Sequence, residues 1–167
     1  MKFSERLKTL RKEQNVTQEA LIKAVGLSVT QYQRYEAETS NPTLPQLEKL
    51  ADFFGVSIDY LVGRTPDNPR HDDDIIRNKL RNKTSRWILR TDFKTRLKEL
   101  RKAEGATQTD MAEAINVKLR QYQNLESGVS RPSFETLIAL ANTFDISLDD
   151  LVGRSKEPTG PDSKEGG

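Results

Sequence analysis

The sequence predicts an all-α protein with two tandem five-helix domains, joined by a linker that contains a helix. Residues 3–64 align without a gap on residues 93–154, at an offset of 90. Apolar residues in both segments recur every three or four positions, as on one face of a helix, and no segment alternates as a strand does. A repeat of this length is within the range of domains that fold alone. The predicted bounds are 1–64 for the first domain, 65–92 for the linker, 93–154 for the second domain and 155–167 for a disordered tail.

Composition excludes several classes of protein. The chain of 167 residues has no Cys and one His, His71, so disulfides, cysteine-zinc sites and thiol nucleophiles are excluded. No run approaches ~18 apolar residues and the N-terminus lacks an apolar signal core, so we expect a cytoplasmic protein. Lys and Arg total 27 against 25 Asp and Glu, and acids and bases balance within each repeat. Nucleic-acid binding would therefore need a local basic patch rather than bulk charge.

The first, fourth and fifth helices of each repeat follow from the spacing of apolar residues. In repeat 1 these are Phe3, Leu7 and Leu10, then Leu44, Leu47, Leu50, Ala51 and Phe54, then Ile58 and Leu61. Over its second to fifth helices, repeat 2 follows the same plan as repeat 1, with Met111, Ile115, Tyr122, Leu125, Phe134, Leu137, Leu140, Phe144 and Leu151. Ser57 is expected to cap the last helix of repeat 1, and Gly63 to end it.

The second and third helices of each repeat are separated by a short turn. Thr17 and Ser28 are suited to begin these two helices in repeat 1, because their hydroxyls accept hydrogen bonds from free backbone amides. Gly26 between them suits a left-handed turn. In repeat 2 Asn116 stands in the place of Gly26, and Asn also tolerates that conformation. The pattern predicts a helix-turn-helix in each repeat.

The runs TQEALIKAVGLSVTQYQRYE and TQTDMAEAINVKLRQYQNLESG are similar to the helix-turn-helix of the Xre/Cro/lambda-repressor family, and SIDYLVGR and SLDDLVGR resemble its last helix. The resemblance extends over both repeats. It implies compact five-helix domains whose third helix enters the major groove of double-stranded DNA. It further implies a transcriptional regulator of bacterial or phage type, associated with the nucleoid. We expect a repressor that acts by occupancy, since no further domain of a size to sense a ligand is visible.

The third helix supplies the candidates for base contacts. Tyr32 and Tyr35 in repeat 1, and Tyr122 and Leu125 in repeat 2, are expected to point into the core. The opposite face then presents Val29, Thr30, Gln33 and Arg34 in repeat 1, and Leu119, Arg120, Gln123 and Asn124 in repeat 2. Arg contacts guanine, Gln and Asn contact adenine, and apolar groups contact the thymine methyl. Because the two sets differ, we expect the repeats to prefer different half-sites.

The resemblance also implies contacts to the phosphate backbone. It places Gln18 and Gln108, at the start of the second helix, against phosphates, where free helix amides favour anions. Similar candidates are Ser28, Lys118 and Arg131, of which Arg131 has the uncharged counterpart Asn41. Repeat 2 is therefore expected to be the stronger electrostatic binder.

Two pairs of opposite charges are placed on the predicted first and third helices. The family uses such a pair, which implies internal ion pairs between Arg11 and Glu36 and between Arg101 and Glu126. The alternative is that these residues share a phosphate contact.

Repeat 1 departs from the family pattern at two positions. Ile22 stands where the family usually has Ala, as repeat 2 does at Ala112. Glu38 stands where repeat 2 has Gly128, and its charge is expected near the phosphate path. Repeat 1 is therefore a candidate for a weaker DNA-binding copy or a protein-binding copy.

The sequence of the linker predicts an amphipathic helix over about 72–90. Acidic residues come first and basic residues last, which suits the helix dipole. Trp87, Ile88 and Leu89 are expected to pack on a neighbouring domain or to form a homodimer interface. The basic residues of the linker are expected either to face solvent or to lie along DNA. The run Asp72–Asp74 is explained by the helix N-terminus rather than by a metal ion.

An alternative function is a protein-interaction adaptor, similar to an antitoxin or anti-repressor, in which one or both helix-turn-helix copies bind a protein. The balanced charge of each repeat keeps this alternative open. No constellation of bases and nucleophiles is visible, so we expect no enzymatic activity. We also expect no cofactor, no metal, no small-molecule ligand and no membrane contact.

Overall fold

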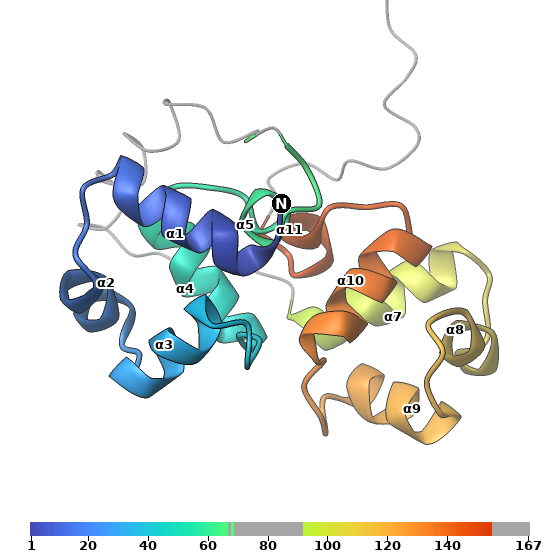
Figure 1. The fold of residues 1–167 in the computed structure, drawn as a ribbon. Coiled ribbons are helices and arrows are strands. Elements are labelled where there is room, and N and C mark those ends of the chain that lie inside the picture. The colour runs from blue at the N-terminus through green and yellow to red at the C-terminus, as the bar shows by residue number, and fades with distance from the viewer. Residues whose placement is uncertain (67, 69–91, 155–167) are drawn as a thin grey trace, which may run out of the picture. The chain divides into compact units, whose positions relative to one another are not determined.

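The computed structural model describes residues 1–66, 68 and 92–154, and Figure 1 shows these residues as helices joined by short loops. The chain divides into two compact units, unit 1 over Met1–Arg86 and unit 2 over Trp87–Gly167. Within the described residues no strand is present, which confirms the predicted all-α fold class.

The described helices repeat the same order in each unit. Unit 1 contains α1 (Phe3–Glu13), α2 (Gln18–Val25), α3 (Val29–Glu36), α4 (Leu44–Phe54) and α5 (Ile58–Val62). Unit 2 contains α7 (Phe93–Ala103), α8 (Gln108–Ala114), α9 (Leu119–Ser127), α10 (Phe134–Thr143) and α11 (Leu148–Leu151). In unit 1, α1 packs against α3 and α5; in unit 2, α7 packs correspondingly against α9 and α11.

The predicted helix starts in unit 1 are confirmed by their hydrogen bonds. Thr17 Oγ1 accepts from the Ala20 amide at 3.2 Å. Ser28 Oγ accepts from the Gln31 amide at 3.1 Å. These bonds satisfy amides that the first turn of a helix leaves without an intrahelical partner, so they fix where α2 and α3 begin.

The predicted turn between the second and third helices is confirmed in both units. Gly26 follows α2 with φ 72° and ψ 40°, which is the left-handed region. Asn116, its counterpart after α8, has φ 54°. Because both residue types adopt this conformation at low cost, the two turns have the same course although their residues differ.

In each unit the third helix packs on the core through the side that carries its buried tyrosine. Tyr32 and Tyr122 are fully buried, and Tyr35 and Leu125 are buried beside them, as predicted. The largest aliphatic side chains buried with them come from the other helices: Leu7, Leu21, Leu47, Leu50, Ile58 and Leu61 in unit 1, and Leu97, Leu137, Leu140 and Leu148 in unit 2. The inward face of each third helix is therefore fixed by packing, and its opposite face is left outward.

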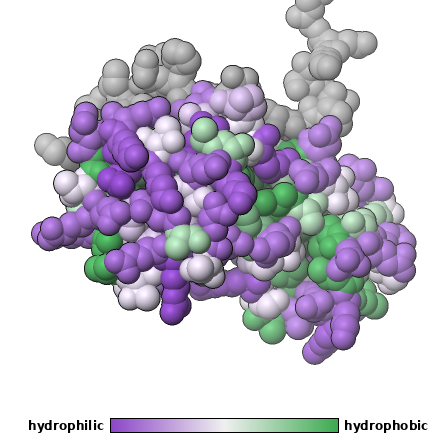
Figure 2. All heavy atoms as spheres, in the orientation of Figure 1, coloured by the Kyte–Doolittle hydropathy of each residue, from purple (hydrophilic) through white to green (hydrophobic). Residues whose placement is uncertain are grey.

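Hydrophilic residues predominate on the face that Figure 2 shows. The exposed large apolar residues of the described part are Met1, Val29, Leu119 and Val129. None of the described helices is both long and apolar enough to cross a membrane. The predicted linker helix over 72–90, with the proposed contact of Trp87, Ile88 and Leu89, lies outside the described residues, as does the tail 155–167.

Candidate nucleic-acid interface

The outward face of α3 is exposed over its whole length. Val29 has 57% of its surface exposed, and Thr30, Gln33 and Arg34 are also exposed. The face exists because Tyr32 occupies the core side of the helix, and residues three to four positions apart share one side. The four base-contact candidates of unit 1 therefore lie together on one accessible surface.

The outward face of α9 is similar at its start but more covered toward its end. Leu119, with 40% of its surface exposed, and Arg120 are accessible, and Lys118 immediately before the helix is also exposed. Gln123 and Asn124 are half-buried. The accessible part of this face is therefore its first turn, where the basic side chains are.

Most arginines of the described part are engaged by neighbouring groups. Arg11 contacts Glu36, and Arg101 contacts Glu126. Arg64 and Arg154 pair with Asp59 and Asp149 respectively. Arg6 lies over the Tyr60 ring, and Arg96 contacts the backbone oxygen of Asp150 and the carboxylate of Glu99.

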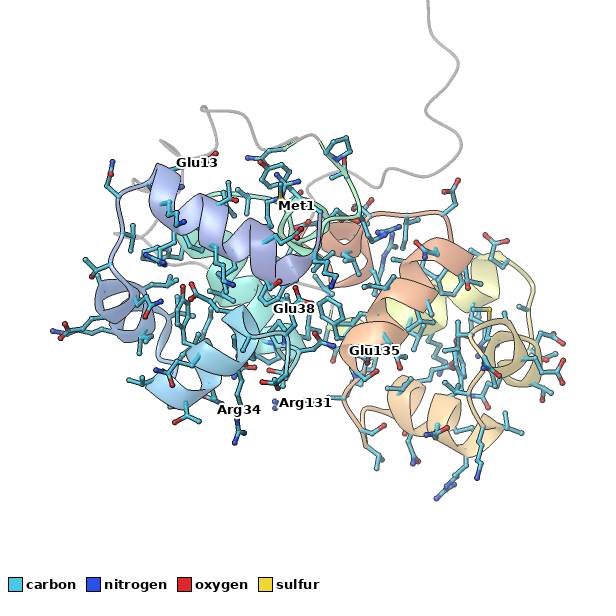
Figure 3. The ribbon with its side chains drawn as sticks, viewed as in Figure 1. Met1, Glu13, Arg34, Glu38, Arg131 and Glu135 are labelled. Carbon is cyan, nitrogen blue, oxygen red and sulfur yellow. The ribbon has the colours of Figure 1, made fainter. Side chains whose placement is uncertain are left out.

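Three arginines of residues 1–66, 68 and 92–154 have no such partner, namely Arg34, Arg120 and Arg131. All three are exposed; Arg34 lies on α3, Arg120 on α9, and Arg131 in the loop after α9. Figure 3 shows Arg34 projecting away from its helix. A guanidinium carries five donors, so these side chains retain their full capacity to bind anions or base edges.

The two glutamines that begin α2 and α8 are hydrogen-bonded to the third helix. Gln18 Nε2 donates to Glu36 Oε2 at 2.9 Å. Gln108 Oε1 accepts from Gln123 Nε2 at 3.5 Å. A glutamine amide has two N–H donors, so Gln18 keeps a second N–H group while Glu36 orients the first.

The expected charge pair between the first and third helices is present in unit 1 as part of a small network. Arg11 Nε lies 3.5 Å from Glu36 Oε1 and donates to the Tyr32 hydroxyl at 3.0 Å. That hydroxyl in turn donates to Glu36 Oε1 at 2.5 Å. Burial, together with the bond to Glu36, raises the pKa of Tyr32, so its hydroxyl stays a donor. The network holds α3 in a fixed position on α1.

The corresponding pair in unit 2 is bidentate. Arg101 Nε donates to Glu126 Oε2 at 2.8 Å, and Arg101 Nη2 donates to Glu126 Oε1 at 2.7 Å. The hydrogen bond from Arg101 holds the pKa of Glu126 below its ordinary value, and the Glu126 carboxylate raises the pKa of Arg101. The charges of Arg101 and Glu126 are therefore paired with each other within unit 2, and the pair holds α9 rigidly against α7.

Glu38 is turned toward the start of α1. Its carboxylate accepts from Lys2 Nζ and from Ser4 Oγ, both at 2.7 Å, and these bonds lower the pKa of Glu38. Its backbone is left-handed, with φ 60°. The positive charge of Lys2 thus compensates the negative charge of Glu38, which was expected near the phosphate path.

Two further ion pairs, which join α5 and α11 to the arginines that follow them, were not expected from the sequence. Asp59 pairs with Arg64, and Asp149 Oδ1 lies 3.0 Å from Arg154 Nη1. The signal was present, because both SIDYLVGR and SLDDLVGR place an Asp five residues before an Arg. These pairs are structural, and no group of three potential metal ligands is found among the described residues.

Each unit thus combines a capped helix, a left-handed turn and a second helix that is anchored on one side and exposed on the other. This arrangement defines a helix-turn-helix domain. The sequence model of the helix-turn-helix family matches residues 7–61 and residues 97–151. The chain therefore belongs to the Xre/Cro-like helix-turn-helix family and carries two tandem copies of its domain.

Curated relatives match the chain over about the length of one copy. It is 44% identical over 62 residues to the cryptic phage CTXphi transcriptional repressor RstR of Vibrio cholerae serotype O1, which is 37% of this chain and 55% of that protein. It is 40% identical over 62 residues to the HTH-type transcriptional regulator AnsR of Bacillus subtilis, which is 37% of this chain and 53% of AnsR. The chain spans about half the length of these relatives. No solved structure matches it significantly.

Proposed function

We propose that the chain is a sequence-specific double-stranded DNA-binding transcriptional regulator that acts as a repressor. The observation that carries the proposal is the distribution of arginines. Among the described residues, those without an internal partner are Arg34, Arg120 and Arg131, on the third helices or just after one of them. The family, and relatives named as transcriptional repressors and regulators, support the same function.

The proposed mechanism is occupancy of two half-sites. The exposed faces of α3 and α9 enter the major groove, where Arg120 and Gln33 contact base edges and Val29 contacts a thymine methyl. Lys118 and Arg131 contact phosphates, together with Gln18 and Gln108 at the start of α2 and α8. Because both copies are on one chain, occupying one half-site raises the effective concentration of the other copy at its own half-site. A bound chain then blocks polymerase.

The test is selection of bound duplexes from a random pool by the full chain, followed by affinity measurements on the selected duplex at several salt concentrations. We expect an enriched sequence, and log K that falls with log salt by about 0.9 for each neutralised phosphate. Lys12→Ala and Lys102→Ala are matched controls, since these exposed lysines occupy equivalent positions in the last turns of α1 and α7. Neither control should change the selected sequence.

The rival function, a protein-interaction adaptor, makes the opposite prediction. An adaptor would show negligible duplex affinity even at ~50 mM salt, where phosphate contacts are strongest. That result, obtained with a folded chain, would rule out the proposed function.

A further inference from the structure

Each third helix carries one exposed arginine without an internal partner, but the two arginines lie at different positions of their helices. Arg34 is in the last turn of α3, and its counterpart in α9 is Asn124. Arg120 is in the first turn of α9, and its counterpart in α3 is Thr30. The glutamine on this face is the same in both copies, Gln33 and Gln123, so the position of the arginine is what differs.

The displacement has a definite size and direction. Thr30 and Arg34 are four residues apart, as are Arg120 and Asn124, so each pair lies on one side of its helix. At ~1.5 Å per residue, four residues correspond to a shift of about 6 Å along the helix axis. The arginine therefore stays on the same face and moves by about one turn.

The neighbouring positions provide a fixed reference. The first residue of each third helix is apolar and exposed, Val29 in α3 and Leu119 in α9. Both side chains suit the methyl group of thymine. An apolar contact at one end of each half-site is therefore common to the two copies, and the arginine contact lies close to it in unit 2 and farther from it in unit 1.

We propose that the two copies read unlike half-sites, in which the guanine contacted by arginine is displaced relative to the shared thymine by about one to two base pairs. This number follows from a shift of about 6 Å against a rise of ~3.4 Å per base pair, reduced where the helix lies oblique to the DNA axis. The proposal rests on the proposed function and adds the residues that determine specificity, Arg34 and Arg120. The preferred operator is consequently not a palindrome.

The test transfers the pattern of one copy to the other. The double variant Thr30→Arg with Arg34→Asn gives α3 the arginine position of α9, and both substituted residues are exposed, so the fold is retained. Full-length wild type and variant are each used to select duplexes from the same random pool. Thermal unfolding of both proteins, and selection with Lys12→Ala, are the controls.

We expect two distinct half-sites for the wild type. For the variant, the guanine of one half-site moves by one to two base pairs, and the two half-sites become alike. The inference is overturned if the wild type selects identical half-sites, or if the substitutions leave the guanine where it was. A wild type that enriches no sequence overturns the proposed function itself, so the two failures are distinguishable.

Discussion

Arg101 binds both carboxylate oxygens of Glu126, at 2.8 and 2.7 Å, and so joins α7 to the third helix of unit 2, α9. The equivalent contact in unit 1 is looser, because Arg11 Nε lies 3.5 Å from Glu36 Oε1 and donates its hydrogen bond to Tyr32 instead. The same pair of residue types therefore anchors the two third helices, α3 and α9, with different geometry. A bidentate, largely buried pair is the stronger of the two.

Arg101→Ala should therefore destabilise unit 2 more than Arg11→Ala destabilises unit 1. Removing Arg101 leaves the Glu126 carboxylate buried without its partner, which costs about 3 kcal/mol. In unit 1 the Tyr32 hydroxyl still donates to Glu36, so the loss should be smaller. Hydrogen exchange of the α3 and α9 amides, measured in the full chain, assigns each loss to its unit. Equal losses in the two variants would mean that the bidentate pair is no stronger than the looser one.

The stability of unit 2 should fall in acid. The hydrogen bond from Arg101 depresses the pKa of Glu126 below its ordinary value of 4.5, so the folded state binds its proton less readily than the unfolded state does. The resulting stabilisation is complete above that value and is lost as the pH falls through the lower, folded pKa. Urea unfolding between about pH 3 and 6 should show this loss for the wild type and a reduced loss for Glu126→Gln. Identical pH profiles would refute the assignment.

Lys118→Ser should separate stability from DNA binding. Ser28 caps α3 through its hydroxyl, whereas α9 has only the Gln121 half of this arrangement, because a lysine side chain accepts no hydrogen bond. The substitution should stabilise unit 2 by about 1 kcal/mol. It should also weaken binding to all duplexes and reduce the salt slope by about 0.9. Binding that is unchanged would remove Lys118 from the interface.

Gly128→Ala should cost more than Gly105→Ala. Both glycines are left-handed, with φ 77° and 65°, so each alanine pays about 1 kcal/mol for that conformation. A Cβ at Gly128 would lie 2.8 Å from Lys94 Cδ, whereas a Cβ at Gly105 meets nothing within 4 Å. The difference between the unfolding free energies of Gly128→Ala and Gly105→Ala, measured by thermal unfolding, gives the cost of displacing the Lys94 side chain. No difference would mean that this side chain moves freely.

Local chemistry explains why much of the fold is predictable from the sequence. Gly26 and Asn116 mark the turn because left-handed backbone favours few residue types, and hydroxyls at Thr17 and Ser28 mark helix starts. The helical spacing that places Tyr32 in the core also identifies the outward face of α3. Each of these signals depends on residues that are close in the sequence, so it can be recognised without knowledge of the tertiary structure.

The features that sequence analysis did not supply depend on contacts between distant segments. Glu38 adopts left-handed backbone, and its carboxylate is bound by Lys2 and Ser4, which lie more than 30 residues earlier in the chain. The half-burial of Gln123 likewise involves another helix, because its amide donates to Gln108 at the start of α8, whereas the equivalent Gln33 of α3 is exposed. Spacing along one helix contains no information about either.

Arg120→Ala in the full chain, measured on the duplex that the wild type selects, is the decisive test of whether the outward face of α9 contacts DNA. We expect a loss of about 1–3 kcal/mol in binding and a relaxed preference at one base pair, because a guanidinium contact to guanine is removed. Lys102→Ala, an exposed charge in the last turn of α7, should leave both unchanged. If Arg120→Ala left affinity and base preference as they were, the outward face of α9 would not be the DNA-binding surface.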